Sequence, residues 1–116
     1  MFRGTFTALV TPFRDGKIDF SALEKLIEAQ IAAGIDGLIA IGTTGETPTL
    51  SHDERLEVVR FILEKTKKRC LVFAGTGSYS TRDAIEATKD AQRLGADAVL
   101  VVAPYYNKPS QEGLFR

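Results

Sequence analysis

The sequence predicts an α/β fold with a parallel sheet, and two observations carry this prediction. Short apolar segments of strand length alternate along the 116 residues with longer segments whose apolar residues recur at helical spacing. In addition, residues 33–39 match residues 94–100, with a glycine, an aspartate and then an apolar strand in both. The two copies lie about 60 residues apart, which is room for two strand–helix units of about 30 residues. We therefore expect four parallel strands joined by right-handed crossovers.

The composition fits a single domain over residues 1–116. Hydrophobic residues make up 44% of the chain, enough to form a core. The 15 basic residues balance the 15 acidic ones, which argues against nucleic acid or an anionic membrane as a partner. The one cysteine, Cys70, has no partner for an internal disulfide, and no segment has the ~18 apolar residues of a membrane span or the core of a signal peptide. We expect a cytoplasmic protein.

The first strand and helix are predicted from residues 5–34. Residues 5–10 alternate and are rich in β-formers, and Pro12 with the pair Asp15-Gly16 predicts the loop that follows. Asp19 is placed to cap a helix, which Gly34 ends. The apolar residues of this helix are Leu23, Leu26, Ile27 and Ile31.

The second strand, residues 38–41, leads into the loop Gly-Thr-Thr-Gly-Glu at residues 42–46. The two glycines let the backbone turn tightly and come close to a ligand. Thr43 and Thr44 offer two hydroxyls and two N–H groups at the carboxyl end of a buried strand, where α/β proteins bind ligands. Such donors suit a small anion, most simply a carboxylate. The same residues also fit a turn that only needs flexibility.

The second helix begins at residues 51–54, Ser-His-Asp-Glu, which have the spacing of a capping box. Its apolar stripe consists of Leu56, Val59, Ile62 and Leu63. Basic residues gather near its end, where positive charge favours the helix dipole. They are Lys65, Lys67, Lys68 and Arg69.

The third strand, residues 70–74, opens into a Gly-Thr-Gly-Ser loop that lacks the spacing and lysine of a P-loop. Ser80 or Thr81 caps the next helix, and Gly95 ends it. One face of that helix carries Ala84, Ile85, Thr88, Ala91 and Leu94. The fourth strand, residues 99–102, is apolar on both faces, as a parallel strand between helices must be. Residues 104–109 follow it, and Ser110 begins another helix.

These elements fit either an open doubly wound sheet or part of a (β/α)8 barrel. An open, flavodoxin-like sheet would place a phosphate at residues 75–78, whereas the loop at residues 42–46 favours a carboxylate at Thr43 and Thr44.

The loops at residues 42–46 and 104–109 together resemble those of the dihydrodipicolinate synthase family, in the pyruvate-dependent aldolase superfamily that also holds N-acetylneuraminate lyase. The likeness runs over the whole chain, and the paired tyrosines followed by Asn107 favour the synthase over its lyase relatives. The resemblance implies that residues 1–116 cover the first four units of a (β/α)8 barrel, the N-terminal half.

The resemblance implies a lyase that joins pyruvate to aspartate-4-semialdehyde in lysine and diaminopimelate synthesis, with pyruvate held as a Schiff base on a lysine. Thr44 matches the residue that binds the pyruvate carboxylate. Thr43 matches a threonine in a proton relay with two tyrosines, one of which corresponds to Tyr106 and reaches into a neighbouring subunit's site. No cofactor or metal is expected. Some members bind lysine in a regulatory pocket, at positions matched here by Thr47, His52, Asp83 and Tyr105. Arg55 and Tyr79 depart from the lysine-sensitive pattern, which favours insensitivity.

The Schiff-base lysine and the second relay tyrosine belong to the part of the family pattern that follows residue 116. Most lysines present lie on helices or their ends, and a helix-surface lysine in water, with a pKa near 10.4, is protonated at neutral pH. Lys17 lies in the first loop and Lys108 beyond the tyrosine pair, so none is expected to replace the Schiff-base lysine. We therefore expect the chain alone to be inactive. Two alternatives stay open: a related aldolase with another acceptor, and a non-catalytic half-barrel. Unpaired strand edges predict a homo-oligomer, formed through these edges or through Tyr105 and Tyr106.

Overall fold

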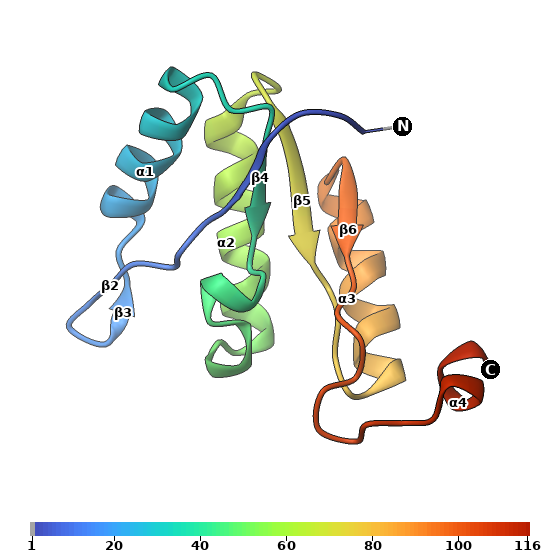
Figure 1. The fold of residues 1–116 in the computed structure, drawn as a ribbon. Helices are drawn as coiled ribbons and strands as arrows, with labels where there is room; N and C mark the ends of the chain where they lie inside the picture. The colour runs from blue at the N-terminus through green and yellow to red at the C-terminus, as the bar shows by residue number, and fades with distance from the viewer. Residues whose placement is uncertain (1) are drawn as a thin grey trace.

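The computed structural model describes residues 2–116 and consists of a parallel sheet with helices packed along one face (Figure 1). The sheet has the order β1-β4-β5-β6, and all its neighbouring strands are parallel. Its strands are β1 (Phe6–Ala8), β4 (Gly37–Ala40), β5 (Leu71–Gly75) and β6 (Ala98–Leu100). The helices are α1 (Phe20–Ala32), α2 (His52–Thr66), α3 (Thr81–Leu94) and the short α4 (Gln111–Phe115).

The strand order decides between the two architectures that the sequence left open. The strands of the sheet follow one another in chain order, with no point at which the order reverses. A doubly wound sheet needs such a reversal, because only then do right-handed crossovers place helices on both faces. Here α1, α2 and α3 lie on the same side of the sheet, as in a (β/α)8 barrel (Figure 1).

The two faces of the sheet differ in what covers them. The face toward the helices is buried and apolar. Leu38, Ala40 and Val72 of the sheet pack there against α1 and α2, with Leu23 and Ile27 as the contacts from α1. The opposite face is apolar as well. Its aromatic rings are those of Phe2 and Phe6, which lie 4.9 and 4.7 Å from the ring of Phe73.

The predicted helix ends are confirmed. The Asp19 carboxylate accepts a hydrogen bond from Ala22 N–H, and Ser51 and Glu54 form the reciprocal bonds of a capping box. Ser80 caps α3, which resolves the choice between Ser80 and Thr81. Gly95 takes up the left-handed conformation where α3 stops, with φ of 89°.

Three details differ from the sequence-based expectation. The loop after the first strand contains a small antiparallel hairpin, β2 (Phe13–Arg14) with β3 (Lys17–Ile18), whose turn uses Asp15 and Gly16 at positive φ. Ile85 is half exposed rather than part of the buried face of α3. The fourth strand is also exposed, because β6 lies at one edge of the sheet.

The repeated aspartates each hold the neighbouring strand. The Asp36 carboxylate accepts a 2.7 Å hydrogen bond from Thr5 N–H beside β1, and Asp97 accepts a 2.9 Å bond from Val72 N–H of β5. Gly4 is required next to the first aspartate, since a Cβ there would lie 2.2 Å from the Asp36 Cγ. The aspartate of each repeat thus accepts a backbone hydrogen bond at the start of the neighbouring strand.

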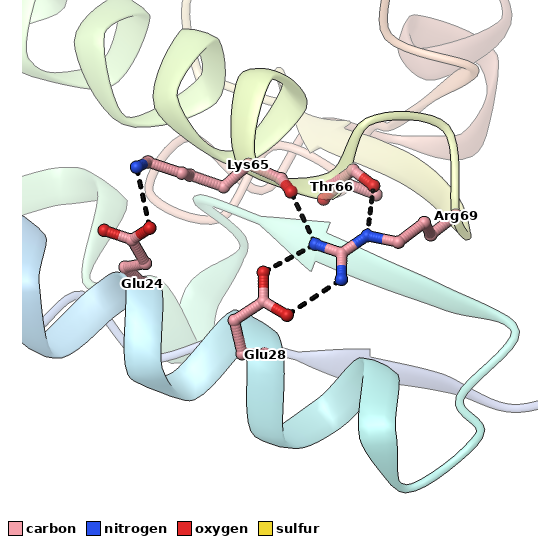
Figure 2. Close-up of polar contacts among 5 residues, drawn as sticks. All are labelled: Glu24, Glu28, Lys65, Thr66 and Arg69. Atoms are coloured by element: carbon pink, nitrogen blue, oxygen red, sulfur yellow. Dashed lines mark hydrogen bonds and ion pairs between the residues drawn. The ribbon is translucent and has the colours of Figure 1, made fainter.

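The basic cluster at the end of α2 does more than meet the helix dipole. Arg69 forms a two-pronged ion pair with Glu28 of α1, and Lys65 pairs with Glu24 one turn away (Figure 2). The Arg69 guanidinium also donates to the carbonyl oxygens of Lys65 and Thr66 in the last turn of the helix, where carbonyls lack partners within the helix, and the Arg69 N–H donates to that of Thr66 as well. Arg69 therefore caps α2 and ties it to α1. Within residues 2–116 no helix is long and apolar enough to cross a bilayer.

Candidate functional site

The candidate site lies where β4 ends, in the loop of residues 42–46. The backbone there forms a 3-10 turn, Thr43–Gly45, in which Gly45 N–H donates to the Gly42 carbonyl and Glu46 N–H to the Thr43 carbonyl. A second 3-10 turn, Thr47–Thr49, follows before α2. Thr43 and Thr44 are both exposed, so their hydroxyls are accessible to a ligand.

The turn out of β4 depends on an unusual backbone conformation at Ile41. Its φ is +46°, in the left-handed region that β-branched residues avoid. Such a conformation costs about 1–3 kcal/mol and persists only where the surroundings fix it. Gly75 at the end of β5 is one such constraint, because a Cβ at this position would lie 2.2 Å from the Ile41 carbonyl oxygen.

Two threonine hydroxyls fasten the loop. The Thr11 hydroxyl, which is buried, donates a 2.8 Å hydrogen bond to the carbonyl oxygen of Gly45. The Thr47 hydroxyl donates to the carbonyl oxygen of Ile41 and lies 3.0 Å from that of Gly42. The loop is therefore held from the segment after β1 and from the second 3-10 turn.

A pocket of about 230 Å³ opens beside the loop, at the carboxyl ends of β4, β5 and β6. Thr43 lines this pocket. Thr44, the next residue in the chain, is not among the lining residues. The lining around Thr43 is mostly apolar with a few polar donors, as in many small-molecule sites. The other lining residues are Ile41, Gly42, Thr47, Pro48, Gly75, Gly77, Leu100, Val102 and Tyr105.

The paired tyrosines after β6 take different positions. Tyr105 lines the pocket, and its ring packs edge-on against the ring of Tyr79 at 5.5 Å. Tyr106 is 81% exposed and lies outside the lining. The Asn107 amide donates to the Tyr79 carbonyl at 3.1 Å, which fixes the tyrosine segment against the start of α3. The structure therefore brings Thr43 and Tyr105 together but leaves Tyr106 on the surface.

The four residues expected for a regulatory site do meet, in a second hollow of about 470 Å³. Thr47, His52, Asp83 and Tyr105 all line it, together with Arg55. The Arg55 Nε donates to the Leu50 carbonyl at 3.1 Å, which keeps the positive charge at this wall.

Sequence reasoning missed three of the residues that build the loop. Thr11 and Gly75 are far from residues 42–46 in the sequence and reach them only through the neighbouring strands. Ile41 was expected as an ordinary strand residue, since its left-handed backbone has no signal in residue type. The glycine at position 75 did stand out as part of a loop motif, but its partner was unknown. In the part of the chain that the structure describes, no group of three or more metal-ligating side chains gathers.

Together these features define a class: four units of a (β/α)8 barrel with a donor-bearing loop at the carboxyl ends of the strands. Residues 1–116 match the model of the dihydrodipicolinate synthetase family. The chain belongs to this family.

Individual relatives agree with the family match. The chain is 59% identical to the 4-hydroxy-tetrahydrodipicolinate synthase of Rhodopseudomonas palustris (strain BisA53), over 98% of the chain and 38% of the relative. The structure of the synthase from Methylacidiphilum fumariolicum SolV matches with a TM-score of 0.97 and 56% identity, over 99% of this chain and 38% of that one. The pyruvate complex of the chloride-inhibited enzyme from Acinetobacter baumannii matches with a TM-score of 0.96 and 51% identity, over 99% and 40%. The chain thus spans about 40% of the length of these relatives.

Proposed function

We propose that residues 1–116 form the pyruvate-binding part of a lyase that condenses pyruvate with aspartate-4-semialdehyde, in lysine and diaminopimelate synthesis. The observation that carries this proposal is the loop of residues 42–46 beside an apolar pocket, in a chain of the dihydrodipicolinate synthetase family. The A. baumannii relative, with 51% identity, was crystallised with pyruvate.

In this proposal Thr43 and Thr44 hold the pyruvate carboxylate. Both threonines are exposed at the end of β4, and each has a hydroxyl and a backbone N–H that can donate to a carboxylate oxygen. Thr43 also joins a relay of hydroxyls that moves protons to and from the enamine.

Tyr106 is the proposed partner of Thr43 in that relay, acting in the site of a neighbouring subunit. Its ring is 81% exposed in the single chain and outside the pocket that Thr43 lines, which supports a role across an interface. The rings of Tyr79 and Tyr106 lie 6.0 Å apart, so the surface around Tyr106 is aromatic and suited to burial.

The Schiff-base amine is not supplied by these residues. In the described part of the chain no lysine lines the pocket beside Thr43. Lys65 and Lys68 are engaged with Glu24 and Asp97 at a distance from the loop. A nucleophilic lysine must reach the bound ligand, and an amine held in an ion pair away from the pocket is not placed to attack pyruvate. The chain by itself is therefore inactive in this proposal.

The test is a hybrid in which residues 1–116 are joined to the part of the R. palustris synthase that follows the matched segment. We expect the hybrid to condense pyruvate with aspartate-4-semialdehyde and the chain alone to show no turnover. In the hybrid, Thr44→Val raises the KM for pyruvate, and Tyr106→Phe lowers kcat. Turnover by the chain alone, or a hybrid that folds and uses another acceptor, contradicts the proposal.

A further inference from the structure

The Ile41 carbonyl is the point on which the candidate loop turns, and two elements confine it. On the side of β5, Gly75 leaves just enough space for the carbonyl oxygen, since a Cβ there would lie 2.2 Å away. On the other side, the Thr47 hydroxyl donates a hydrogen bond to the same oxygen. The carbonyl is thus confined by close packing against β5 on one side and by a hydrogen bond from the second 3-10 turn on the other.

The Thr47 hydroxyl is hydrogen-bonded within the loop. It is also 3.0 Å from the Gly42 carbonyl oxygen, so its single proton is shared between consecutive carbonyls. Among residues 2–116 the side-chain hydrogen bonds to these two oxygens all come from Thr47. Its side chain is half-buried, consistent with an internal role.

The hydrogen bonds from Thr47 offset the cost of the strained backbone at Ile41, which sets the direction of the loop. Ile41 has φ of +46°, which a β-branched residue leaves unless its surroundings hold it. Thr43 lies only two residues after Ile41, so the direction of its hydroxyl and N–H depends on the backbone conformation of Ile41 and Gly42. If the carbonyls were released, Ile41 would relax to negative φ and the donors of Thr43 would turn away from the pocket.

We propose that Thr47 is a positioning residue: its hydroxyl holds the Ile41 and Gly42 carbonyls so that Thr43 faces the pocket. The part of this inference that concerns pyruvate rests on the proposed function. Because Thr47 also lines the pocket, the backbone at Ile41, rather than binding alone, is the readout of this role.

The experiment compares three variants of the chain. Thr47→Val removes the hydroxyl at nearly constant volume, and Thr47→Ser keeps it. The control is Thr49→Val, since the Thr49 hydroxyl donates to the Glu46 carbonyl in the same turn and not to the carbonyls of Ile41 or Gly42. Backbone NMR shifts of residues 41–45 report φ at Ile41, and titration with pyruvate reports binding at Thr43.

We expect Thr47→Val to lose the positive-φ shifts of Ile41 and to bind pyruvate about five-fold more weakly, the equivalent of one net hydrogen bond. Thr47→Ser and Thr49→Val keep the values of the parent chain. A Thr47→Val chain with unchanged shifts at Ile41 overturns the inference. If the parent chain shows no pyruvate response, the proposed pyruvate site fails, and the Ile41 shifts alone decide the role of Thr47.

Discussion

Gly75 shows how strongly the site depends on a residue far from it in the sequence. The close approach of the Ile41 carbonyl to this position leaves no room for a side chain. Because the neighbour is backbone at the end of a strand, it cannot move aside as a flexible side chain would. Gly75 is therefore one of the residues that set the shape of the loop at residues 42–46, together with Thr11 and Thr47.

Replacing Gly75 by alanine is expected to destabilise the fold by about 1–3 kcal/mol or more, as an overpacked core position does. Gly42→Ala is the matched control, because its Cβ would meet only the Ile39 Cγ2 at 3.5 Å and its φ is −74°. Urea unfolding followed by circular dichroism measures both. Equal stability of the two variants would contradict the packing of Ile41 against Gly75.

The residue types at the loop were readable from the sequence, but their geometry was not. Glycines and threonines after an apolar strand predicted a donor-rich turn at Thr43 and Thr44, and both are exposed there. The constraints on that turn come from Thr11, Thr47 and Gly75, and their proximity follows from strand pairing and loop packing rather than from spacing. That the pocket would include Thr43 and exclude Thr44 could not be predicted for the same reason.

Helices α1 and α2 are joined by ion pairs that local patterns did not reveal. Spacing within one helix explains why basic residues gather at the end of α2, but Glu24 and Glu28 lie 41 residues earlier in the chain than their partners. The caps of the helices, by contrast, were predictable because they join residues three positions apart. Patterns within a few residues were thus enough to predict the helices and their ends, whereas the ion pairs between helices depend on tertiary packing.

Arg69→Ala is expected to lower the melting temperature more than Glu28→Gln does. The alanine variant loses the ion pair and also the bonds to the carbonyls of Lys65 and Thr66, whereas the glutamine variant loses only charge. Both effects should be smaller than that of Ile27→Ala, a core truncation that costs about 2–5 kcal/mol. Differential scanning calorimetry measures the order. A Glu28→Gln effect larger than that of Arg69→Ala would contradict the capping role.

Acid should loosen the helix ends before it affects the core. The Ala22 N–H at the start of α1 lowers the pKa of Asp19, the Arg69 guanidinium lowers that of Glu28, and the Ser51 N–H lowers that of Glu54. A lowered carboxyl pKa stabilises the fold above the ordinary value, 3.8 for Asp and 4.5 for Glu, and this stabilisation is lost as pH falls through the folded value. We expect the melting temperature to fall steadily below about pH 4.5. Thermal melts from pH 7 to pH 3 test this, and a constant melting temperature over that range would contradict it.

At the level of the whole chain, the sheet has two unpaired edges, one on β1 and one on β6. The residues along and after β6 are apolar and exposed: Val99, Leu100, Val101 and Val102 have exposed fractions of 37%, 46%, 58% and 43%. The unpaired N–H and C=O groups of such an edge, next to exposed apolar side chains, offer a surface on which another chain can pair. Four strands in one copy and four in another would supply the eight of a closed barrel.

We therefore expect the isolated chain to self-associate at micromolar concentration, and Leu100→Lys on β6 to shift it toward the monomer. Ile85→Lys is the control, because Ile85 is exposed to a similar extent, 50%, but lies on α3 away from the strand edge. Multi-angle light scattering gives the mass. A sharp monomer of the parent chain, or an equal effect of both lysine substitutions, would contradict association through the sheet edge.

The most direct measurement is the intact mass of the chain after treatment with pyruvate and borohydride, which reduces a Schiff base to a stable adduct. If residues 1–116 provide the carboxylate loop but not the nucleophile, the mass stays at 12.7 kDa, while the hybrid with the rest of the R. palustris synthase gains one pyruvate. A specific pyruvate adduct on a lysine of the 116-residue chain would contradict this division of the site.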